Sequence, residues 1–509
     1  MVARTVSAAI LGIQAVLIKV EVDITNGLPA FDIVGLPDKA VRESRERVRS
    51  AIKNSGFEFP VKRITINMAP ADIKKIGPHF DLAIAAGILA VEGVIKKSEL
   101  QDFILAGELS LGGEVRKVKG ILPMALNAVR KEKEGLVIPA PNYQEGNLVE
   151  DLKVIPVTSL GELVSFFNQG QIPPVPELED QKQQTDYEED FAEIKGQKEA
   201  RRALEVAAAG AHNMIMIGPP GSGKTMMARR LRTILPPLSE KEALELTKIY
   251  SIMGLTETRE GLLKKRPFRA PHHTITRAGL IGGGRIPEPG EVSLAHRGTL
   301  FLDEMPEFKR DVLEMLRQPL EEGKVSLVRS EMKATFPADF MLVAAMNPCP
   351  CGYYGDNRHE CHCSVPRINR YRGRISGPLM DRIDIHVHVP GLQASEITSR
   401  AEGESSAEIR KRVTEAHQIQ LERYHREDFD YNSNLGSQKM EQYCQLEPEG
   451  QRLLKQAIED LALSARAYDR ILRLARTIAD LEGAANNKIK SDFVAEAIQY
   501  RSLDRRMQI

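Results

Sequence analysis

A short glycine-rich segment between an apolar strand and a helical pattern constrains this chain most. It follows the apolar run Asn213–Ile217 and precedes the helical pattern Met226–Leu235. Its residues are Gly218, Pro219, Pro220, Gly221, Ser222, Gly223, Lys224 and Thr225. Glycines at these spacings let backbone N–H groups close around phosphate oxygens, while the lysine reaches the β- and γ-phosphates. The segment therefore predicts an ATP-binding α/β domain in which Thr225 also holds Mg²⁺.

Two carboxylates stand at the end of a second apolar strand. Thr299–Leu302 runs directly into Asp303 and Glu304. The C-terminal tip of a buried parallel strand faces the ligand, so we predict that Asp303 holds Mg²⁺ and that Glu304 polarises the attacking water. A third strand, Phe340–Met346, ends at Asn347, whose amide would orient water beside the γ-phosphate. The alternatives are a solvated turn for the two acids and a strand-capping amide for Asn347.

Length and local composition divide the chain into three domains and a linker. The chain has 509 residues, more than one ordinary core holds. Residues 1–168 alternate strand-like and helical runs, which predicts an α/β or α+β domain, and residues 169–190 are rich in Pro, Gln and acids, as in a linker. Residues 191–392 form the nucleotide-binding domain. Residues 393–509 are mostly helical by pattern, over Ser405–Arg423, Gly450–Ala462, Ala465–Leu481 and Ser491–Tyr500.

Charge, hydropathy and cysteine count argue against several classes of protein. Lys and Arg total 70, as do Asp and Glu, so net charge gives no global argument for nucleic-acid binding. The most apolar early stretch, Leu82–Val94, is short and reads as a buried helix rather than a membrane span. The N-terminal residues lack a signal-peptide pattern, and five cysteines make no disulfide framework in a chain this long. We therefore expect a cytoplasmic protein.

Longer motifs resemble a known family. They are Arg266–His273, Leu280–Gly284 and Pro289–His296. They resemble the magnesium-chelatase-like AAA+ ATPases, and the whole chain resembles their YifB/ComM branch. That resemblance implies a Lon-protease-like N-terminal domain, an AAA+ core and a C-terminal helical lid. It also implies a ring, commonly a homo-hexamer, that hydrolyses ATP and moves branched or single-stranded DNA during natural transformation. Recombination proteins are further partners that it implies.

Rings of this kind complete each active site with an arginine from a neighbouring subunit. The segment Gly377–Asp384 resembles the family segment that carries this arginine. Arg382 is therefore the first candidate, and Arg374 is the second. A surface ion pair is the alternative for each of them.

A second kind of arginine is expected in the helical lid. The segment Ser464–Arg473 resembles the helix that folds over bound nucleotide, and its arginines lie close to one helical face. Arg466 is the first candidate for the nucleotide contact, and Arg470 is the second. A surface ion pair is again the alternative.

Two C-x-C pairs follow Asn347 closely. They comprise Cys349, Cys351, Cys361 and Cys363. Four thiolates on two short loops can close a tetrahedral Zn²⁺ site, with His359 and His362 as substitute ligands. Four protein ligands leave no open position, so such a zinc would be structural. Reduced thiols and a redox disulfide are the alternatives.

The first domain resembles the Lon-type protease domain. The resemblance lies in Ile64–Pro78, Phe80–Leu82, Gly107–Leu109 and Gly113–Val115. That family needs a serine directly after a Gly-Pro pair and a lysine in a later helix, whereas this chain has His79 and Leu122 at those positions. We therefore expect a non-proteolytic relative used for assembly or DNA handling, as in the RadA family. Phosphate contacts, or only a solvated basic face, would come from Lys62, Arg63, Lys74 and Lys75.

Together with the ATP-binding residues, the family resemblance implies an ATP-driven motor that moves branched DNA. Its pore elements would be the insert Arg269–Gly284 and the hairpin-like segment Lys324–Phe336, in which apolar residues alternate around a polar turn. The motor subunit of a magnesium chelatase that remodels a protein partner is the second hypothesis. A regulator of an ATP-dependent protease is the third, which the missing serine and lysine disfavour.

Overall fold

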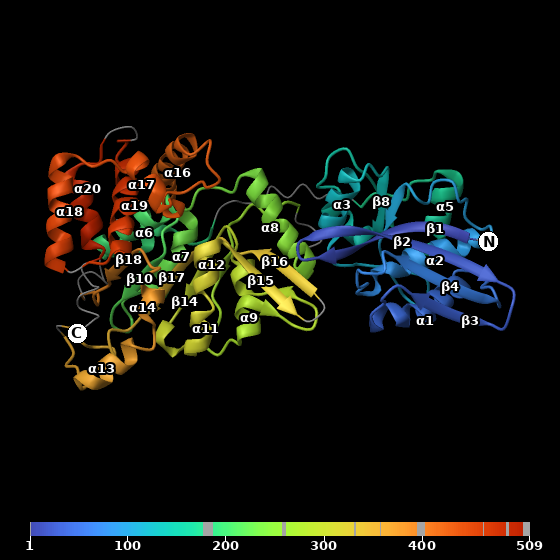
Figure 1. The fold of residues 1–509 in the computed structure, drawn as a ribbon, viewed down its shortest axis with the longest axis horizontal. Coiled ribbons are helices and arrows are strands. Elements are labelled where there is room, and N and C mark those ends of the chain that lie inside the picture. The colour runs from blue at the N-terminus through green and yellow to red at the C-terminus, as the bar shows by residue number, and fades with distance from the viewer. Residues whose placement is uncertain are drawn as a thin grey trace. The chain divides into compact units, whose positions relative to one another are not determined.

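Two large sheets organise the chain, one mixed and one parallel (Figure 1). The computed structural model describes residues 2–176, 187–256, 261–329, 332–356, 358–393, 403–461, 463–484 and 488–501. The N-terminal unit comprises Met1–Gln183, Glu240–Leu263 and Ser330–Phe336. The phosphate-loop unit comprises Gln184–Ser239, Lys264–Arg329 and Pro337–Ile509.

The N-terminal unit is built on a seven-stranded sheet in the order β3-β4-β2-β1-β5-β8-β9. Its strands are β1 (Val2–Leu11), β2 (Gln14–Thr25), β3 (Ala30–Val34), β4 (Arg63–Ala69), β5 (Phe103–Leu105), β8 (Gly135–Pro139) and β9 (Lys153–Val157). β1 and β2 form a long antiparallel hairpin, and β2 pairs antiparallel with β4. The pairs β3–β4, β1–β5, β5–β8 and β8–β9 are parallel.

Helices cover this sheet, and its apolar residues divide into two clusters. The helical elements are α1 (Lys39–Asn54), η1 (Pro78–Phe80), α2 (Asp81–Val91), α3 (Ile121–Arg130), η2 (Ala140–Asn142), α4 (Tyr143–Gly146) and α5 (Leu160–Gln169), and a small sheet pairs β6 (Glu108–Leu109) with β7 (Val115–Arg116). Asp38 caps α1 by accepting from the backbone N–H of Val41. Helix α2 is apolar on every side, and all but its last residue are buried, as its sequence predicts.

One helix of the N-terminal unit comes from the middle of the chain. Helix α8 (Glu240–Met253) packs against α3, although it lies in sequence within the predicted nucleotide-binding domain 191–392. Buried Glu145 fixes this excursion by accepting from the hydroxyl of Ser251 and from the backbone N–H of Leu122 at 3.0 Å. Lys117 donates to the carbonyl of Thr256 at 2.8 Å. The compact units thus differ from the expected domain boundary at this helix.

The phosphate-loop unit is built on a parallel five-stranded sheet in the order β11-β14-β17-β10-β18. Its strands are β10 (Met214–Ile217), β11 (Phe268–Arg269), β14 (Thr299–Leu302), β17 (Met341–Met346) and β18 (Ile385–His388). Alternate residues of β10 enter opposite clusters, because successive side chains of a strand point to opposite faces. The predicted parallel α/β core is therefore confirmed.

Helices and short strands surround this sheet, and the C-terminal helices form a layer of their own (orange to red in Figure 1). The elements that precede this layer are η3 (Phe191–Glu193), α6 (Lys198–Gly210), α7 (Lys224–Ile234), α9 (Arg277–Ile281), β12 (Gly282–Gly283), β13 (Glu288–Pro289), α10 (Glu291–Leu294), η4 (Met305–Glu307), α11 (Arg310–Glu314), α12 (Arg317–Glu322), α13 (Val365–Arg372) and α14 (Gly377–Met380). The layer itself contains α16 (Ser406–Arg423), η5 (Asn432–Asn434), α17 (Ser437–Tyr443), α18 (Pro448–Leu461), α19 (Ala465–Leu481) and α20 (Ser491–Gln499). The predicted helical character of the C-terminal region is confirmed, while this region belongs to the same compact unit as the phosphate loop. Among the described helices, none is long and apolar enough to cross a membrane.

Buried polar contacts attach the C-terminal helices to the parallel sheet. His212 lies between Asp384 and Thr477, at 3.3 Å from the carboxylate and 2.8 Å from the hydroxyl. Arg470 of α19 donates to the carbonyl of Ile383 at 2.9 Å. Burial would raise the pKa of Asp384, but the hydrogen bond with His212 and the charge of Arg470 hold it well below its usual range. Helix α19 is therefore fixed to the segments that lead into β10 and β18.

The predicted hairpin is confirmed as β15 (Lys324–Arg329) paired with β16 (Met332–Pro337). Lys324 and Lys333 are exposed on it, whereas the side chain of Arg329 falls outside the described residues.

For one candidate lysine of the N-terminal domain, Lys75, the predicted phosphate contact is wrong. Lys75 is fully buried and donates to the carbonyl of Pro70. Lys62 and Arg63 are exposed and lie 3.6 Å from Glu92 and Asp32, respectively. The sequence alone does not distinguish buried Lys75 from these exposed residues, because Lys75 becomes buried only when the loop that follows β4 has folded.

The contacts of Glu145 predict that α8 depends on this one carboxylate. In Glu145→Ala, the backbone N–H of Leu122 and the hydroxyl of Ser251 lose a buried acceptor, so the free energy of unfolding of the N-terminal unit should fall by about 2–3 kcal/mol. Thermal unfolding, together with the rate of proteolytic cleavage within 240–263, measures the loss. The control is Glu150→Ala, which removes an exposed carboxylate. Equal stability of the two variants would contradict the anchoring role of Glu145.

Candidate functional site

The tips of three neighbouring parallel strands bring the predicted site residues together. β17 pairs with β10 on one side and with β14 on the other, with Met346 opposite Ile217 and Ala344 opposite Leu302. The residue that follows each strand therefore lies at the same carboxyl edge. In parallel sheets this edge is where ligands bind.

The phosphate loop is held closed by its own lysine. The ammonium of Lys224 donates to the carbonyls of Gly218 and Pro219, both at 2.8 Å, and lies 3.3 Å from the amide oxygen of Asn347. Gly223 adopts a φ of +89°, a conformation that side chains disfavour, directly before α7 begins. Burial lowers the pKa of Lys224, while Asp303 and Glu304 act in the opposite direction. The structure thus brings Lys224 and Asn347 together at the end of β17.

Two oxygen ligands suitable for Mg²⁺ face each other beside this loop. The hydroxyl of Thr225 donates to the carboxylate of Asp303 at 2.7 Å. Mg²⁺ prefers oxygen ligands at about 2.1 Å, and neighbouring ligands of one octahedral ion lie about 3 Å apart, so this pair fits the ion. Glu304 follows with a φ of +49°, a strained backbone at the turn between β14 and η4, and its side chain is exposed.

A tyrosine that the sequence did not single out also borders this edge. Tyr371 of α13 is buried, and its phenol is close to the backbone of Asn347. Burial raises the pKa of Tyr371 to about 12, and the charge of Glu307 acts in the same direction. Nothing in the sequence around Tyr371 distinguishes it from the other polar residues of an arginine-rich helix.

The structure separates the two candidates for the donated arginine. Arg382 forms an ion pair with Glu321 of its own chain and donates to the carbonyl of Pro378 at 2.6 Å. Arg374 lies 2.8 Å from Glu307, in the loop that follows Asp303 and Glu304 of the same chain. In this chain Arg374 is thus tied to its own catalytic loop, while Arg382 is not.

The lid arginines differ in the same way. Arg470 is buried and donates to the carbonyl of Ile383, so its guanidinium is already used within the protein. Arg466, at the start of α19, is largely exposed and lies 3.5 Å from Asp381 in a weak surface pair. The first candidate therefore keeps a guanidinium that can turn to a ligand.

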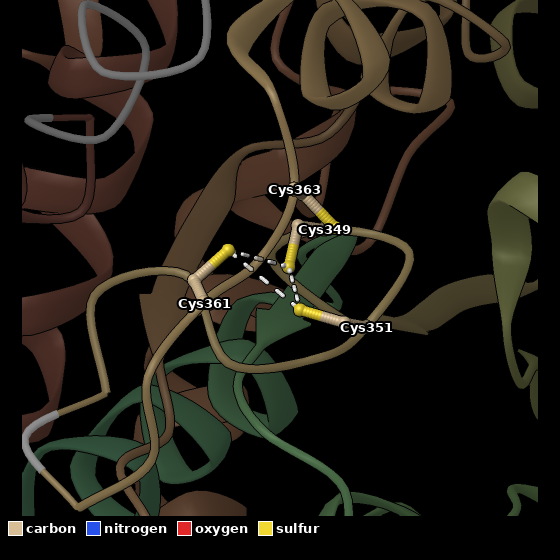
Figure 2. Close-up of side chains that lie close together, drawn as sticks. All are labelled: Cys349, Cys351, Cys361 and Cys363. Atoms are coloured by element: carbon tan, nitrogen blue, oxygen red, sulfur yellow. Dashed lines mark hydrogen bonds between the residues drawn. The ribbon is translucent and has the colours of Figure 1, made fainter.

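The four clustered cysteines converge. Their sulfurs all lie within 4.8 Å of one another, and the side chains of Cys349, Cys351 and Cys361 point toward each other (Figure 2). The sulfur of Cys349 is 3.3 Å from that of Cys351 and 3.7 Å from that of Cys361. Tetrahedral zinc with Zn–S bonds of about 2.3 Å places its sulfurs about 3.8 Å apart. Within the cluster, the backbone N–H of Tyr353 is the main cause that lowers the pKa of Cys351 to about 6, whereas burial raises the pKa of Cys361 to about 12.

The cysteine loop lies directly against the phosphate loop. A methyl group added at Gly352, whose φ is +90°, would stand 2.5 Å from the Cδ of Pro220. Arg358 donates to the carbonyl of Gly391, and a Cβ at Gly391 would lie 3.7 Å from the Cγ of Pro219. The conformation of the cysteine loop therefore bears on that of the phosphate loop.

In the N-terminal unit, the position after the Gly-Pro pair holds a buried histidine. His79 is buried, and its ring nitrogen lies 2.8 Å from the carbonyl of Ala8. Burial lowers the pKa of His79 to about 4. Asp81 beside it accepts from Arg47 at 2.7 Å and from the hydroxyl of Ser44. The position after the Gly-Pro pair is thus part of the core.

Comparison with known proteins gives the family. The family model for the magnesium chelatase subunit ChlI matches residues 190–397. A model for subunit ChlI of Mg-chelatase matches residues 20–142, and a ChlI C-terminal model matches residues 403–501.

Individual relatives cover nearly the whole chain. The competence protein ComM of Haemophilus influenzae is 43% identical over 507 residues, which cover 99% of this chain and 98% of that protein. YifB of Salmonella typhimurium is 43% identical over 499 residues, covering 98% of this chain and 96% of that protein. Lon protease 2 of Bacillus subtilis is 28% identical over 185 residues, covering 31% of this chain and 33% of that protein. The chain therefore belongs to the YifB/ComM family of magnesium-chelatase-like AAA+ proteins.

Proposed function

We propose that the protein hydrolyses ATP at sites shared between the subunits of a homo-oligomeric ring, a hexamer by family resemblance. The observation that supports this most is the convergence of Lys224, Asn347 and the Thr225–Asp303 pair at the edge of one parallel sheet. Membership of the AAA+ family supports a ring, because proteins of this family are expected to form oligomers.

Each residue at this edge has a chemical role in the proposal. The loop Gly218–Thr225 binds the phosphates, and Lys224 exchanges its carbonyl partners for phosphate oxygens. Thr225 and Asp303 would hold Mg²⁺, which neutralises charge on the phosphates when bound. Glu304 accepts a proton from the attacking water, and Asn347 orients that water. Arg382 of one subunit stabilises the charge that develops in its neighbour's site, and Arg466 of the lid contacts bound nucleotide.

We propose that this ATPase moves branched DNA, as a branch-migration helicase in natural transformation or recombination in the cytoplasm. The near full-length similarity to a competence protein supports this function. The hairpin β15–β16 offers exposed Lys324 and Lys333 to phosphates, and cationic contacts of this kind bind DNA without regard to sequence.

The alternative is the motor subunit of a magnesium chelatase, which remodels a protein partner. The ChlI family models favour it. Against it stands the similarity to ComM and YifB, which are 43% identical and cover 99% and 98% of this chain. A regulator of a protease is the weakest alternative, because His79 and Leu122 occupy the positions of the serine and the lysine.

We also propose that the four cysteines bind a structural Zn²⁺. The thiolate donor set and the sulfur separations suit tetrahedral zinc, and four protein ligands leave no open position for catalysis. Because Gly352 touches Pro220, the metal would hold the cysteine loop in the shape that supports the phosphate loop.

The catalytic role of Glu304 is tested together with the DNA function. Glu304→Gln should bind ATP normally but lower kcat by about 10²–10⁴-fold, because it loses the general base. Wild-type ATPase should rise with branched DNA, and strand exchange at a synthetic junction should require Glu304. The exposed neighbour variant Glu322→Gln is the control and should behave as wild type. An ATPase that responds to no DNA but responds to a protein partner would reject the DNA motor in favour of the chelatase alternative.

Mixing two inactive variants tests whether Arg382 acts on its neighbour. Lys224→Ala loses its own site, and Arg382→Ala should lose about 10³–10⁵-fold in kcat. In mixed rings, an intact loop from one variant meets an intact arginine from the other, so part of the ATPase rate should return. Arg374→Ala mixed with Lys224→Ala, beside the exposed control Arg370→Ala, separates the two candidates. If co-assembled rings of the first mixture stay inactive, Arg382 is not the donated arginine.

Metal analysis tests the zinc site and its effect on the phosphate loop. The wild-type protein should carry about one zinc per chain, and Cys361→Ser/Cys363→Ser should carry almost none. The zinc-free variant should bind ATP severalfold more weakly, since the loop against Pro220 loses its shape. His362→Ala, an exposed neighbour, should keep both metal and affinity. Wild-type protein without zinc rejects the site, and unchanged ATP affinity in the zinc-free variant rejects the coupling.

A further inference from the structure

A basic pocket of about 660 Å³ lies within the phosphate-loop unit. It is lined by Tyr187, Arg232, Leu235, Pro236, Pro237, Lys264, Lys265, Arg266, Ala407, Arg410, Lys411, Thr414, Glu415 and Gln418. Six of these residues are Lys or Arg, and one is Glu. None of these residues belongs to the proposed ATP site, so ATP binding at that site does not account for the positive charge of the pocket.

Two of the guanidinium groups are fixed within the protein. Arg266 is buried and donates to the carbonyls of Pro236 and Arg297, both at 2.7 Å, which holds the base of the pocket in place. Arg232 pairs with Glu189 at 2.7 Å. The ion pair with Glu189 neutralises the charge of Arg232 within the protein. Both sets of contacts hold the wall of the pocket in place.

The other cations remain available to a ligand. Lys264, Lys265 and Lys411 are exposed, and Arg410 is half-buried. Within the described part of the chain, none of the four forms an ion pair. Tyr187 collects two of the pocket's cations, with Arg232 at 5.1 Å and Lys265 at 5.6 Å from its ring centroid. The uncompensated charge therefore gathers at one opening.

The shape and composition of the pocket suit a nucleotide chain better than a simple anion. Its volume is far larger than a phosphate ion needs and lies in the range of about 300–1,000 Å³ that holds nucleotide-sized ligands. Leu235, Pro236 and Pro237 offer apolar surface for a sugar or base, while the lysines meet phosphates. Proteins that bind single strands combine a cationic groove with aromatic side chains, and Tyr187 is the aromatic residue of this lining.

We propose that this pocket binds the backbone of single-stranded nucleic acid. The three exposed lysines contact its phosphates, and the ring of Tyr187 positions Lys265 beside them. This inference rests on the proposed DNA function and adds to it a contact point outside the hairpin β15–β16.

The test removes the three lysines from the full-length protein and measures binding of labelled oligothymidine across a salt series. Lys264→Gln/Lys265→Gln/Lys411→Gln should bind about tenfold more weakly or worse, and the slope of log K against log salt should fall by about two, near 0.7 per lost contact. The matched control Lys455→Gln/Lys488→Gln/Lys490→Gln removes the same charge from exposed positions outside the pocket and should keep the slope. ATPase activity without DNA should be unchanged in both.

A second pair of variants tests the role of the aromatic ring of Tyr187. Tyr187→Ala should weaken binding severalfold because it releases Lys265, whereas Tyr187→Phe keeps the aromatic face and should bind as wild type. If the triple lysine variant and its control bind with equal affinity and equal salt slope, the pocket proposal is overturned. The proposed DNA function survives that result when Glu304→Gln still abolishes junction movement. Displacement of the strand by free thymidine monophosphate at equal nucleotide concentration, or binding only to an acidic protein, would also overturn it. A wild-type protein that binds no strand would reject the DNA function itself.

Discussion

The parallel pairing of β17 between β10 and β14 is the constraint on which the nucleotide site depends. It sets the residues that follow three separate strands at one edge, although Ile217, Leu302 and Met346 are far apart in sequence. A register shift of one residue would turn Asn347 away from Lys224 and reverse which face of the sheet each apolar residue meets. The opposite clustering of Met214 and Ile215 on β10 makes such a shift costly. Core packing thus fixes the geometry of the chemistry.

The buried ammonium of Lys224 then sets the state of the loop. Its hydrogen bonds to the carbonyls of Gly218 and Pro219 satisfy a charge that would otherwise be buried without partners. The same carbonyls are weaker partners than phosphate oxygens, which carry full negative charge. The carbonyls of Gly218 and Pro219 therefore hold the ammonium of Lys224 within the loop, at a place where phosphate oxygens would be stronger partners. The Thr225–Asp303 hydrogen bond likewise holds the two oxygen ligands of the cation site together.

The sequence allowed prediction of those residues whose chemistry lies next to a strand or helix signal. Asp303 and Asn347 follow apolar runs directly, and the cysteines stand in two C-x-C pairs, so local pattern located them. The helices of the C-terminal layer were marked by their periodicity. Tyr371, by contrast, reaches the site only through packing of α13, and no local pattern shows it. The pairing of Arg382 with Glu321 is equally invisible, since it joins α12 to the segment after α14.

The excursion of α8 was also missed, because its mixed polar and apolar composition resembles that of any surface helix. The excursion of α8 nevertheless shows where the basic pocket lies along the chain. The chain leaves the phosphate-loop unit after Pro236 and Pro237, behind the helix that begins at Lys224, and re-enters it at Lys264. Both points line the pocket, and buried Arg266 ties them together through the carbonyl of Pro236. Leu235 and Pro236 follow directly after the end of α7 and line the pocket, so the position of α7 bears on the shape of the pocket.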